Sequence, residues 1–222
     1  MNGNERRGAV GIEVLEQVCS RICHDLAGPV GAIRNGLELI ADGEEAGAEA
    51  TDDQAMELIG HSAGHAARRL RLYRLAYGRA TSEGVRSFSE MREAAADWLA
   101  GGRVTLQWPS DSPNDDLAAR PGLAKTILNL VVLAAEAIPQ GGIVTVLGEG
   151  GPESGKVVVA AAGRGVKWPP EQAVALSGRM TPGAIGPRTI HPVITGRFAD
   201  HYGLSLNWDT SGGEHLALRL TW

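Results

Sequence analysis

Residues 21–39 read RICHDLAGPVGAIRNGLEL, and this stretch decides the fold. On a helix that turns about 100° per residue, the apolar residues of this region fall within roughly 60° of one line. These residues are Leu15, Val18, Ile22, Leu26, Val30, Ile33, Leu37 and Ile40. His24 lies about 180° from that line. The pattern therefore predicts an amphipathic helix that presents its histidine to solvent.

The helix predicted around this stretch runs from about Gly11 to Ala41. An acidic, glycine- and alanine-rich segment at 42–53 is expected to form a loop, and a second helix follows over 54–79. The broad apolar face of the second helix contains Met56, Ile59, Ala63, Leu70, Tyr73 and Tyr77. Two long helices joined by a loop form an antiparallel hairpin. Because a lone hairpin cannot enclose a core, we predict a C2 dimer in which two hairpins make a four-helix bundle.

From Thr81 onward the pattern changes to helices that alternate with mostly antiparallel strands. Helices are expected at 89–100, with Ser89 as N-cap, at 121–138 and at 194–201. Strands are expected at 104–108, 142–149, 156–162, 205–209 and 215–222, and a loop-rich, proline-rich stretch at 166–192. This order predicts an α+β fold in which helices cover one face of a sheet. We therefore expect a hairpin domain at 1–80, a linker at 81–84 and a second domain at 81–222.

Composition excludes several classes of protein. The chain has 222 residues, a formal net charge of −5 and a pI near 5.7, which argue against nonspecific nucleic-acid binding. No apolar run approaches the roughly 20 residues that a membrane span needs, and the N-terminus lacks a signal-peptide pattern. The two cysteines, Cys19 and Cys23, share one helix, which excludes a disulfide framework and favours a reducing cytoplasm. We expect them to be small buried or half-buried helix residues.

Small residues surround His24 on the polar side of the first helix. They are Ser20, Ala27, Gly28 and Gly31. A glycine inside a helix costs about 1 kcal/mol relative to alanine, so packing or access is expected to retain the two glycines. Pro29 removes a backbone hydrogen bond and can bend the helix. These features predict a flat, accessible platform around the imidazole.

The motif His24-Asp25-Leu26-x-x-Pro29 resembles the H-box of histidine kinases. The longer string from Ser20 to Leu39 is similar to the ChpT-type histidine phosphotransferases of alphaproteobacteria. The resemblance covers essentially the whole chain. It implies a hairpin domain that carries a phospho-accepting histidine, followed by an α/β sandwich that resembles the histidine kinase ATPase domain.

The second half departs from the kinase pattern at its nucleotide-binding boxes. Two of these boxes are matched by 129–142 and 157–166, whereas the final glycine-rich box has no clear counterpart and 189–199 stands roughly in its place. Leu133 stands where kinases carry a metal-binding asparagine, and leucine cannot coordinate Mg²⁺. Ala161 replaces the aspartate that reads adenine, although Gly163 and Gly165 remain and are expected to form a structural turn. The resemblance therefore implies a degenerate ATPase domain with no nucleotide, cofactor or metal of its own.

The resemblance implies a phosphorelay intermediate. His24 would accept a phosphoryl group from the receiver domain of a hybrid histidine kinase and pass it to response regulators. The receiver would supply Mg²⁺, a lysine and the acceptor aspartate, while Asp25 would orient the imidazole. Contacts to the phosphoryl group or the partner are expected from Arg21, Gly28, Gly31, Arg34 and Asn35.

Two other interpretations stay open. A divergent histidine kinase would bind Mg-ATP and phosphorylate itself. A non-enzymatic dimeric adaptor would sequester receivers, and its output would be unchanged by His24→Ala. His61 and His65 have the i, i+4 spacing of metal ligands, but no third ligand accompanies them, so we interpret them as surface residues.

Overall fold

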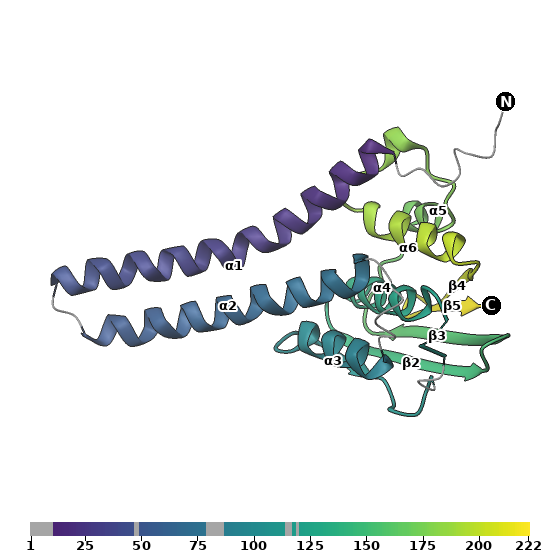
Figure 1. Cartoon of the computed structure of the whole chain (residues 1–222), viewed down its shortest axis with the longest axis horizontal. Helices are drawn as coiled ribbons and strands as arrows, with labels where there is room; N and C mark the ends of the chain where they lie inside the picture. Colours follow the sequence, from purple (N-terminus) through teal and green to yellow (C-terminus); the bar gives the residue numbers. More distant parts are fainter. Residues whose placement is uncertain (1–10, 47–48, 79–86, 114–116, 119) are drawn as a thin grey trace.

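The chain folds into a long helical hairpin that projects from an α+β body (Figure 1). The computed structural model describes residues 11–46, 49–78, 87–113, 117–118 and 120–222. Helix α1 spans Ile12–Ala46 and helix α2 spans Glu49–Tyr77. The two helices lie side by side over most of their length and separate where they reach the body, so that α1 contacts α6 while α2 contacts α3 and α4. The predicted hairpin and α+β class are confirmed.

The prediction of a loop at 42–53 is wrong for most of this segment. Helix α1 continues to Ala46 and α2 begins at Glu49. The segment is rich in alanine and glutamate, which are strong helix formers, and this propensity outweighs its glycines and charge. Helix α1 also continues through Pro29 without interruption.

The apolar stripe of α1 divides into two parts. Its partly buried residues are Val18, Ile22, Leu26, Ile33 and Ile40, and its exposed residues are Leu15, Val30 and Leu37. The buried part faces α2 closely, because a Cβ atom added at Gly36 would lie 2.6 Å from Ile59 Cγ1. The hairpin thus buries one side of the stripe within a single chain and leaves the other side open.

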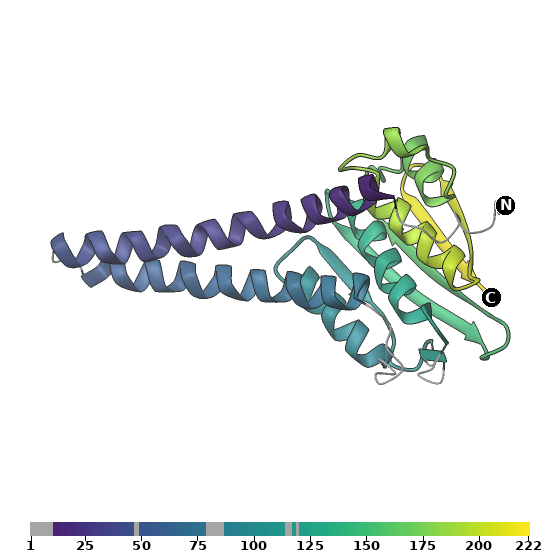
Figure 2. The same cartoon turned by 45° about the horizontal axis from the view of Figure 1, so that its top comes forward.

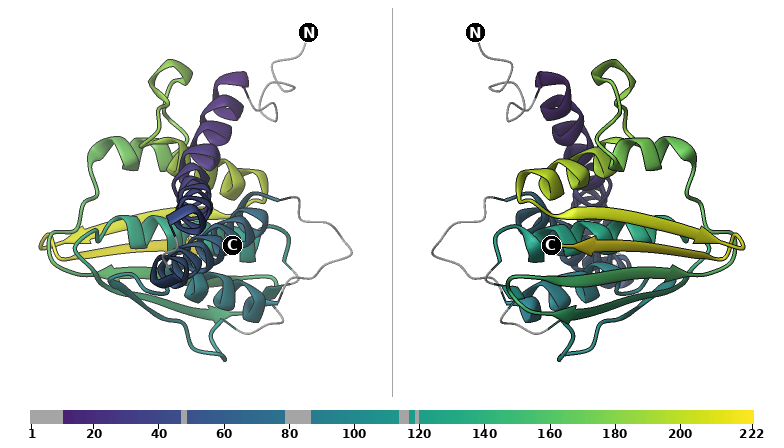
Figure 3. Two further views of the ribbon diagram at one scale, coloured as in Figure 1. Left: turned by 90° about the vertical axis from the view of Figure 1, so that its left-hand side faces the viewer. Right: turned by 90° about the vertical axis from the view of Figure 1, so that its right-hand side faces the viewer.

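The body is a five-stranded mixed sheet with its helices on one face, as Figures 2 and 3 show. Its helices are α3 (Phe88–Leu99), α4 (Leu123–Glu136), α5 (Pro170–Leu176) and α6 (Ile190–His201), with a 3-10 turn, η3, at Pro182–Ala184. Its strands are β1 (Val104–Gln107), β2 (Gly142–Gly150), β3 (Gly155–Ala162), β4 (Ser205–Ser211) and β5 (His215–Thr221). The strand order is β1-β2-β3-β5-β4, with β1 parallel to β2 and the other pairs antiparallel.

Several boundaries differ from the sequence predictions. Helix α3 is capped by Ser87, whose side chain accepts a hydrogen bond from Glu90 N at 3.2 Å, and not by Ser89. The stretch predicted as loop at 166–192 contains α5 and the start of α6. Both helices tolerate proline because it lies in their first turn, where backbone N–H groups have no intrahelical partner. The predicted linker at 81–84 lies outside the described residues.

Helix α4 forms the centre of the body and is buried along its whole length from Leu123 to Ala135. Such a helix is mostly apolar because it packs on the sheet with one face and on helices with the other. A second cluster of buried residues joins α1 to the body, since Val14 packs with Ile185 and Ile190. This contact fixes the N-terminal part of α1, and with it His24, relative to the α+β body.

Candidate functional site

His24 is the most accessible of the residues predicted to act chemically. Its side chain is 88 % exposed, and its Nδ1 lies 3.3 Å from Asp25 Oδ1. A carboxylate oxygen can only accept a hydrogen bond, so a neutral ring in this arrangement carries its proton on Nδ1 and donates it to Asp25. The unprotonated nitrogen is then Nε2, which is the nucleophilic atom of the ring.

Two residues of α2 hold the other oxygen of Asp25. The Tyr73 hydroxyl donates to Asp25 Oδ2, and Arg69 Nη1 lies 3.3 Å from the same atom. Burial, and then the hydrogen bond to Asp25, raise the pKa of Tyr73, so the phenol keeps its proton and remains a donor. The ring of Tyr73 stacks on Tyr77 at 5.5 Å. Asp25 is therefore held between the imidazole of α1 and two donors of α2.

Arg21, one turn before His24, pairs with Glu136 at the end of α4. The Arg21 side chain is only 16 % exposed. Burial acts to lower the pKa of Arg21, but the carboxylate of Glu136 outweighs it and raises that pKa. The pair is therefore ionised, and it connects the hairpin to the second half of the chain.

Behind this ion pair lies His191 of α6, which is buried. Its Nε2 is 3.0 Å from Asn129 Oδ1 and its Nδ1 is 3.6 Å from Glu136 Oε2. Burial lowers the pKa of His191, so the neutral ring donates from Nε2 to Asn129. Burial acts to raise the pKa of Glu136, but hydrogen bonding and charge from His191 and Arg21 lower it to about 2. Because burial keeps His191 neutral, we assign this lowering chiefly to Arg21.

Asn129 completes the connection between the helices. Its Nδ2 donates to Ala76 O of α2 at 3.0 Å and to Lys125 O at 2.9 Å. Hydrogen bonds between buried polar groups favour one arrangement of the elements that carry them. The network of Arg21, Glu136, His191 and Asn129 therefore ties α1, α2, α4 and α6 together.

A cleft of about 500 Å³ lies between the hairpin and the body, and His24 and Asp25 are part of its wall. Three guanidinium groups line it, from Arg21, Arg69 and Arg188, together with the two carboxylates of Asp25 and Glu136. The cleft therefore carries one positive charge in excess, although the chain as a whole is negative. Such a site attracts an anionic group.

The other residues predicted for docking lie outside the cleft, farther along α1. Gly28, Arg34 and Asn35 are exposed and Gly31 is partly buried. Arg34 Nε lies 3.5 Å from Glu38 Oε1. A Cβ atom added at Gly28 or Gly31 would have no neighbour within 4 Å, so packing does not require either glycine. Their contact with a partner stays a prediction.

Sequence reasoning missed Arg69, Tyr73 as a donor, Glu136, His191 and Arg188. Arg69 and Tyr73 are four residues apart on α2, and this spacing was the only sequence signal that could have paired them on one face. The contacts of Glu136, His191 and Arg188 join segments far apart in the chain. Periodicity carries no information about such pairs.

The two positions predicted to replace nucleotide ligands are buried. Leu133 and Ala161 are 2 % and 1 % exposed and belong to the hydrophobic core. A Cβ atom at Gly163 would lie 2.5 Å from Gly141 O, and Gly165 has a φ of +64°. The two glycines therefore form a close-packed turn, as predicted.

The cysteine prediction is wrong, because Cys19 and Cys23 are both exposed and free. They lie within about 40° of Val30 on the helical wheel, on the open side of the apolar stripe. Within the described part of the chain, no three His, Cys, Asp or Glu side chains are arranged to hold a metal ion. Over the same residues, no helix combines the length and apolar character that crossing a membrane requires.

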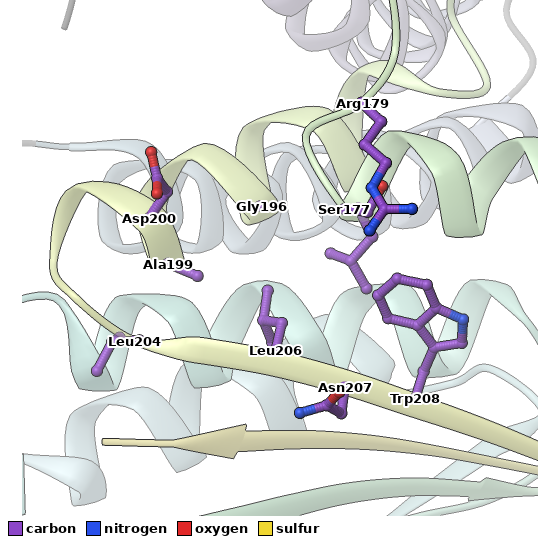
Figure 4. Close-up of a pocket in the computed structure, with 10 residues that line it drawn as sticks. Ser177, Arg179, Gly196, Ala199, Asp200, Leu204, Leu206, Asn207 and Trp208 are labelled. Carbon is purple, nitrogen blue, oxygen red and sulfur yellow. The ribbon is translucent and has the colours of Figure 1, made fainter. Parts of the chain in front are cut away.

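A second pocket, of about 450 Å³, lies between α5, α6 and the edge strand β4. Figure 4 shows Arg179 extending toward Trp208 across this pocket, with Asp200 at its other end. None of its lining residues belongs to the hairpin, so this pocket is separate from the cleft at His24.

Comparisons with known proteins show which families and solved structures this chain resembles. The family described as "Histidine phosphotransferase C-terminal domain" matches residues 88–214. The protein phosphotransferase ChpT of Brucella abortus (strain 2308) is 33 % identical over 191 residues, which cover 86 % of this chain and 87 % of that protein. A solved bacterial phosphotransferase matches with a TM-score of 0.76 and 27 % identity, over 96 % of this chain and 97 % of that one.

Proposed function

This chain belongs to the histidine phosphotransferase family, and we propose that it relays a phosphoryl group between receiver-domain aspartates through phospho-His24. The observation that carries the proposal is the state of the imidazole. Its ring is exposed at the edge of a positively charged cleft, and Asp25 engages Nδ1 so that Nε2 is the free nucleophile.

The proposed transfer is a direct displacement at phosphorus. Nε2 of His24 attacks the phosphorus of an aspartyl phosphate, the Nε2–P bond forms, and the P–O bond to the aspartate breaks, leaving a carboxylate. Nδ1 keeps its proton, and Asp25 stabilises the positive charge that develops on the ring. The second transfer reverses these steps onto the aspartate of another receiver. The phosphoryl oxygens must be neutralised in both directions.

The partners that fit this chemistry are the receiver domain of a hybrid histidine kinase as donor and response regulators as acceptors. We expect the receiver to hold Mg²⁺ and to contribute a lysine and the acceptor aspartate. This chain would then supply a positioned imidazole and a docking surface. The cleft supports this assignment of roles to the two proteins, because both the hairpin and the body line it and could contact a receiver.

We propose that the chain acts without ATP. Nucleotide binding needs polar ligands at the positions of Leu133 and Ala161, and both side chains are apolar and buried. Mg²⁺ takes oxygen ligands, which neither residue offers. The second domain, which we assign to 81–222, would therefore serve as a wall against which receivers dock beside the hairpin domain at 1–80.

We also propose that two chains associate through their hairpins into a four-helix bundle. Five of the exposed apolar residues of the hairpin repeat at seven-residue intervals, which is the spacing of packed helices. They are Val30 and Leu37 on α1 and Met56, Ala63 and Leu70 on α2. His24 and Leu37 are about 140° apart on the helical wheel, so a partner on this stripe leaves the imidazole accessible.

The relay is tested with a phosphorylated receiver domain. We expect acid-labile phosphate to appear on the wild-type chain and on His61→Ala, which changes another exposed histidine of the hairpin. It should be absent from His24→Ala. Incubation with Mg-ATP alone should leave His24 unmodified. Transfer of phosphate through the His24→Ala chain, or self-phosphorylation from Mg-ATP, would contradict the proposal.

A further inference from the structure

The three arginines of the cleft differ in what already surrounds them. Arg21 is paired with Glu136, and Arg69 lies 3.3 Å from the carboxylate of Asp25. Arg188 is exposed and makes no hydrogen bond or ion pair within the described part of the chain. The excess positive charge of the cleft therefore resides on Arg188.

The turn that carries Arg188 is fixed at both ends. Thr189 Oγ1 accepts a hydrogen bond from Gly186 N at 2.9 Å, and Thr189 N and Ile190 N both donate to Gly186 O. Ile185 and Ile190, on either side of the turn, are buried against Val14 of α1. The turn is thus anchored to the same helix that carries His24.

The anchored turn places the Arg188 cation in the same cleft as the His24 imidazole. Arg188 and His24 line one cleft, from opposite sides of the contact between the body and the hairpin. A guanidinium offers a planar set of donors that matches phosphate oxygens. The chemistry of Arg188 therefore suits a phosphoryl group bound in this cleft.

We propose that Arg188 binds the phosphoryl oxygens of phospho-His24, so that the second domain contributes a ligand to the phosphohistidine as well as a docking wall. This inference rests on the proposed relay and deepens it. It makes the site of the phosphohistidine a composite of both domains. After the first transfer the receiver dissociates. Arg188 would then neutralise the negative charge of the phosphoryl group that stays on His24.

The experiment follows the ionisation of the phosphoryl group by ³¹P NMR. The phosphohistidine is prepared with phosphoramidate, whose P–N bond breaks and releases ammonia as the Nε2–P bond forms, or with a phosphorylated receiver that is then removed. A nearby guanidinium favours the dianionic phosphoryl group. We therefore expect Arg188→Gln to move the titration midpoint up by about one pH unit, and Arg188→Lys to move it less.

The matched control is Arg179→Gln, since Arg179 is an exposed arginine of the same domain in the separate pocket of Figure 4. Its titration midpoint should equal that of the wild type. An unchanged midpoint in Arg188→Gln would overturn the proposal, even if binding of the receiver weakened, because Arg188 would then contact the receiver. If neither donor placed phosphate on wild-type His24, the relay itself would fail, and this inference with it.

Discussion

Asp25 contacts Nδ1 of His24, and its own position depends on Tyr73 and Arg69. One carboxylate oxygen faces the imidazole and the other receives the Tyr73 hydroxyl and the Arg69 guanidinium. The residue that follows His24 in sequence is therefore oriented by residues 44 and 48 positions away on α2. The hairpin therefore exposes the imidazole and also places an acceptor, the Asp25 carboxylate, at its Nδ1.

Tyr73→Phe tests this arrangement. The change removes the donor to Asp25 but keeps the aromatic ring that stacks on Tyr77. A hydrogen bond to a charged acceptor contributes about 1.5 kcal/mol, and 1.4 kcal/mol corresponds to a tenfold ratio. We expect phosphotransfer to His24 to slow roughly tenfold while the Kd of the receiver stays unchanged. Rapid quench-flow measures the rate of phosphotransfer, and a binding titration measures the Kd of the receiver.

Tyr77→Phe is the control for this prediction. The Tyr77 ring keeps its place in the stack, and its hydroxyl makes no hydrogen bond within the described part of the chain. The ¹⁵N shifts of His24 should report a smaller Nδ1–H population in Tyr73→Phe alone. Equal rates and equal ¹⁵N shifts in the two variants would show that Tyr73 does not orient the site.

For single residues, the sequence predicts which face of a helix they occupy but few of the contacts they make with other helices. The exposure of His24 follows from helical periodicity, and the structure confirms it. The pairing of Arg21 with Glu136 spans 115 positions of sequence, and no periodic signal encodes it. Buried polar contacts of this kind depend on which helices meet, so they become visible only when the elements are placed.

Helix α1 has two glycines near His24 that packing does not explain. A Cβ atom at Gly28 or Gly31 would meet nothing within 4 Å, whereas one at Gly36 would lie 2.6 Å from Ile59 Cγ1. Glycine inside a helix is destabilising by roughly 0.5–1 kcal/mol relative to alanine. Because packing within the chain does not explain this destabilisation, we infer that the two glycines contact a partner protein.

Gly28→Ala should therefore stabilise the protein and impair docking. We expect a Tm increase of about 2–3 °C, together with a weaker Kd for the receiver, measured by calorimetry. Gly36→Ala, on the side of α1 that faces α2, should lower the Tm because the added methyl group overpacks the crossing. Unchanged receiver affinity in Gly28→Ala would remove the argument that Gly28 forms part of the docking surface.

Elements were predicted well where apolar periodicity is long, as in α1, α2 and α4, and less well where short signals compete. Glycines and acids predict a loop at 42–53, but alanine and glutamate extend both helices into this segment. Helix α5 was missed because Pro169 and Pro170 suggested a loop, although proline is compatible with a helix N-terminus.

The molecule as a whole joins the hairpin to the body through a polar network and through two apolar clusters, one reached from α2 and one from α1. Arg21, Glu136, His191 and Asn129 connect hairpin and body through hydrogen bonds and charges, and Val14 connects them through apolar packing. Without the body, the hairpin alone would not form the cleft that His24 lines. The junction therefore makes His24 and Arg188 parts of one site, although 164 positions of sequence separate them.

The open side of the apolar stripe gives the final prediction, which concerns assembly. Leu37 is 55 % exposed on α1, at a position that a partner hairpin would cover. A glutamate buried at such an interface lacks a partner and is strongly unfavourable. We expect Leu37→Glu to convert a dimer to a monomer, measured by light scattering after size-exclusion chromatography. Leu147→Glu, on the sheet at 52 % exposure, should remain dimeric. A monomeric wild type, or a dimeric Leu37→Glu, would show that the stripe is not the contact between two chains.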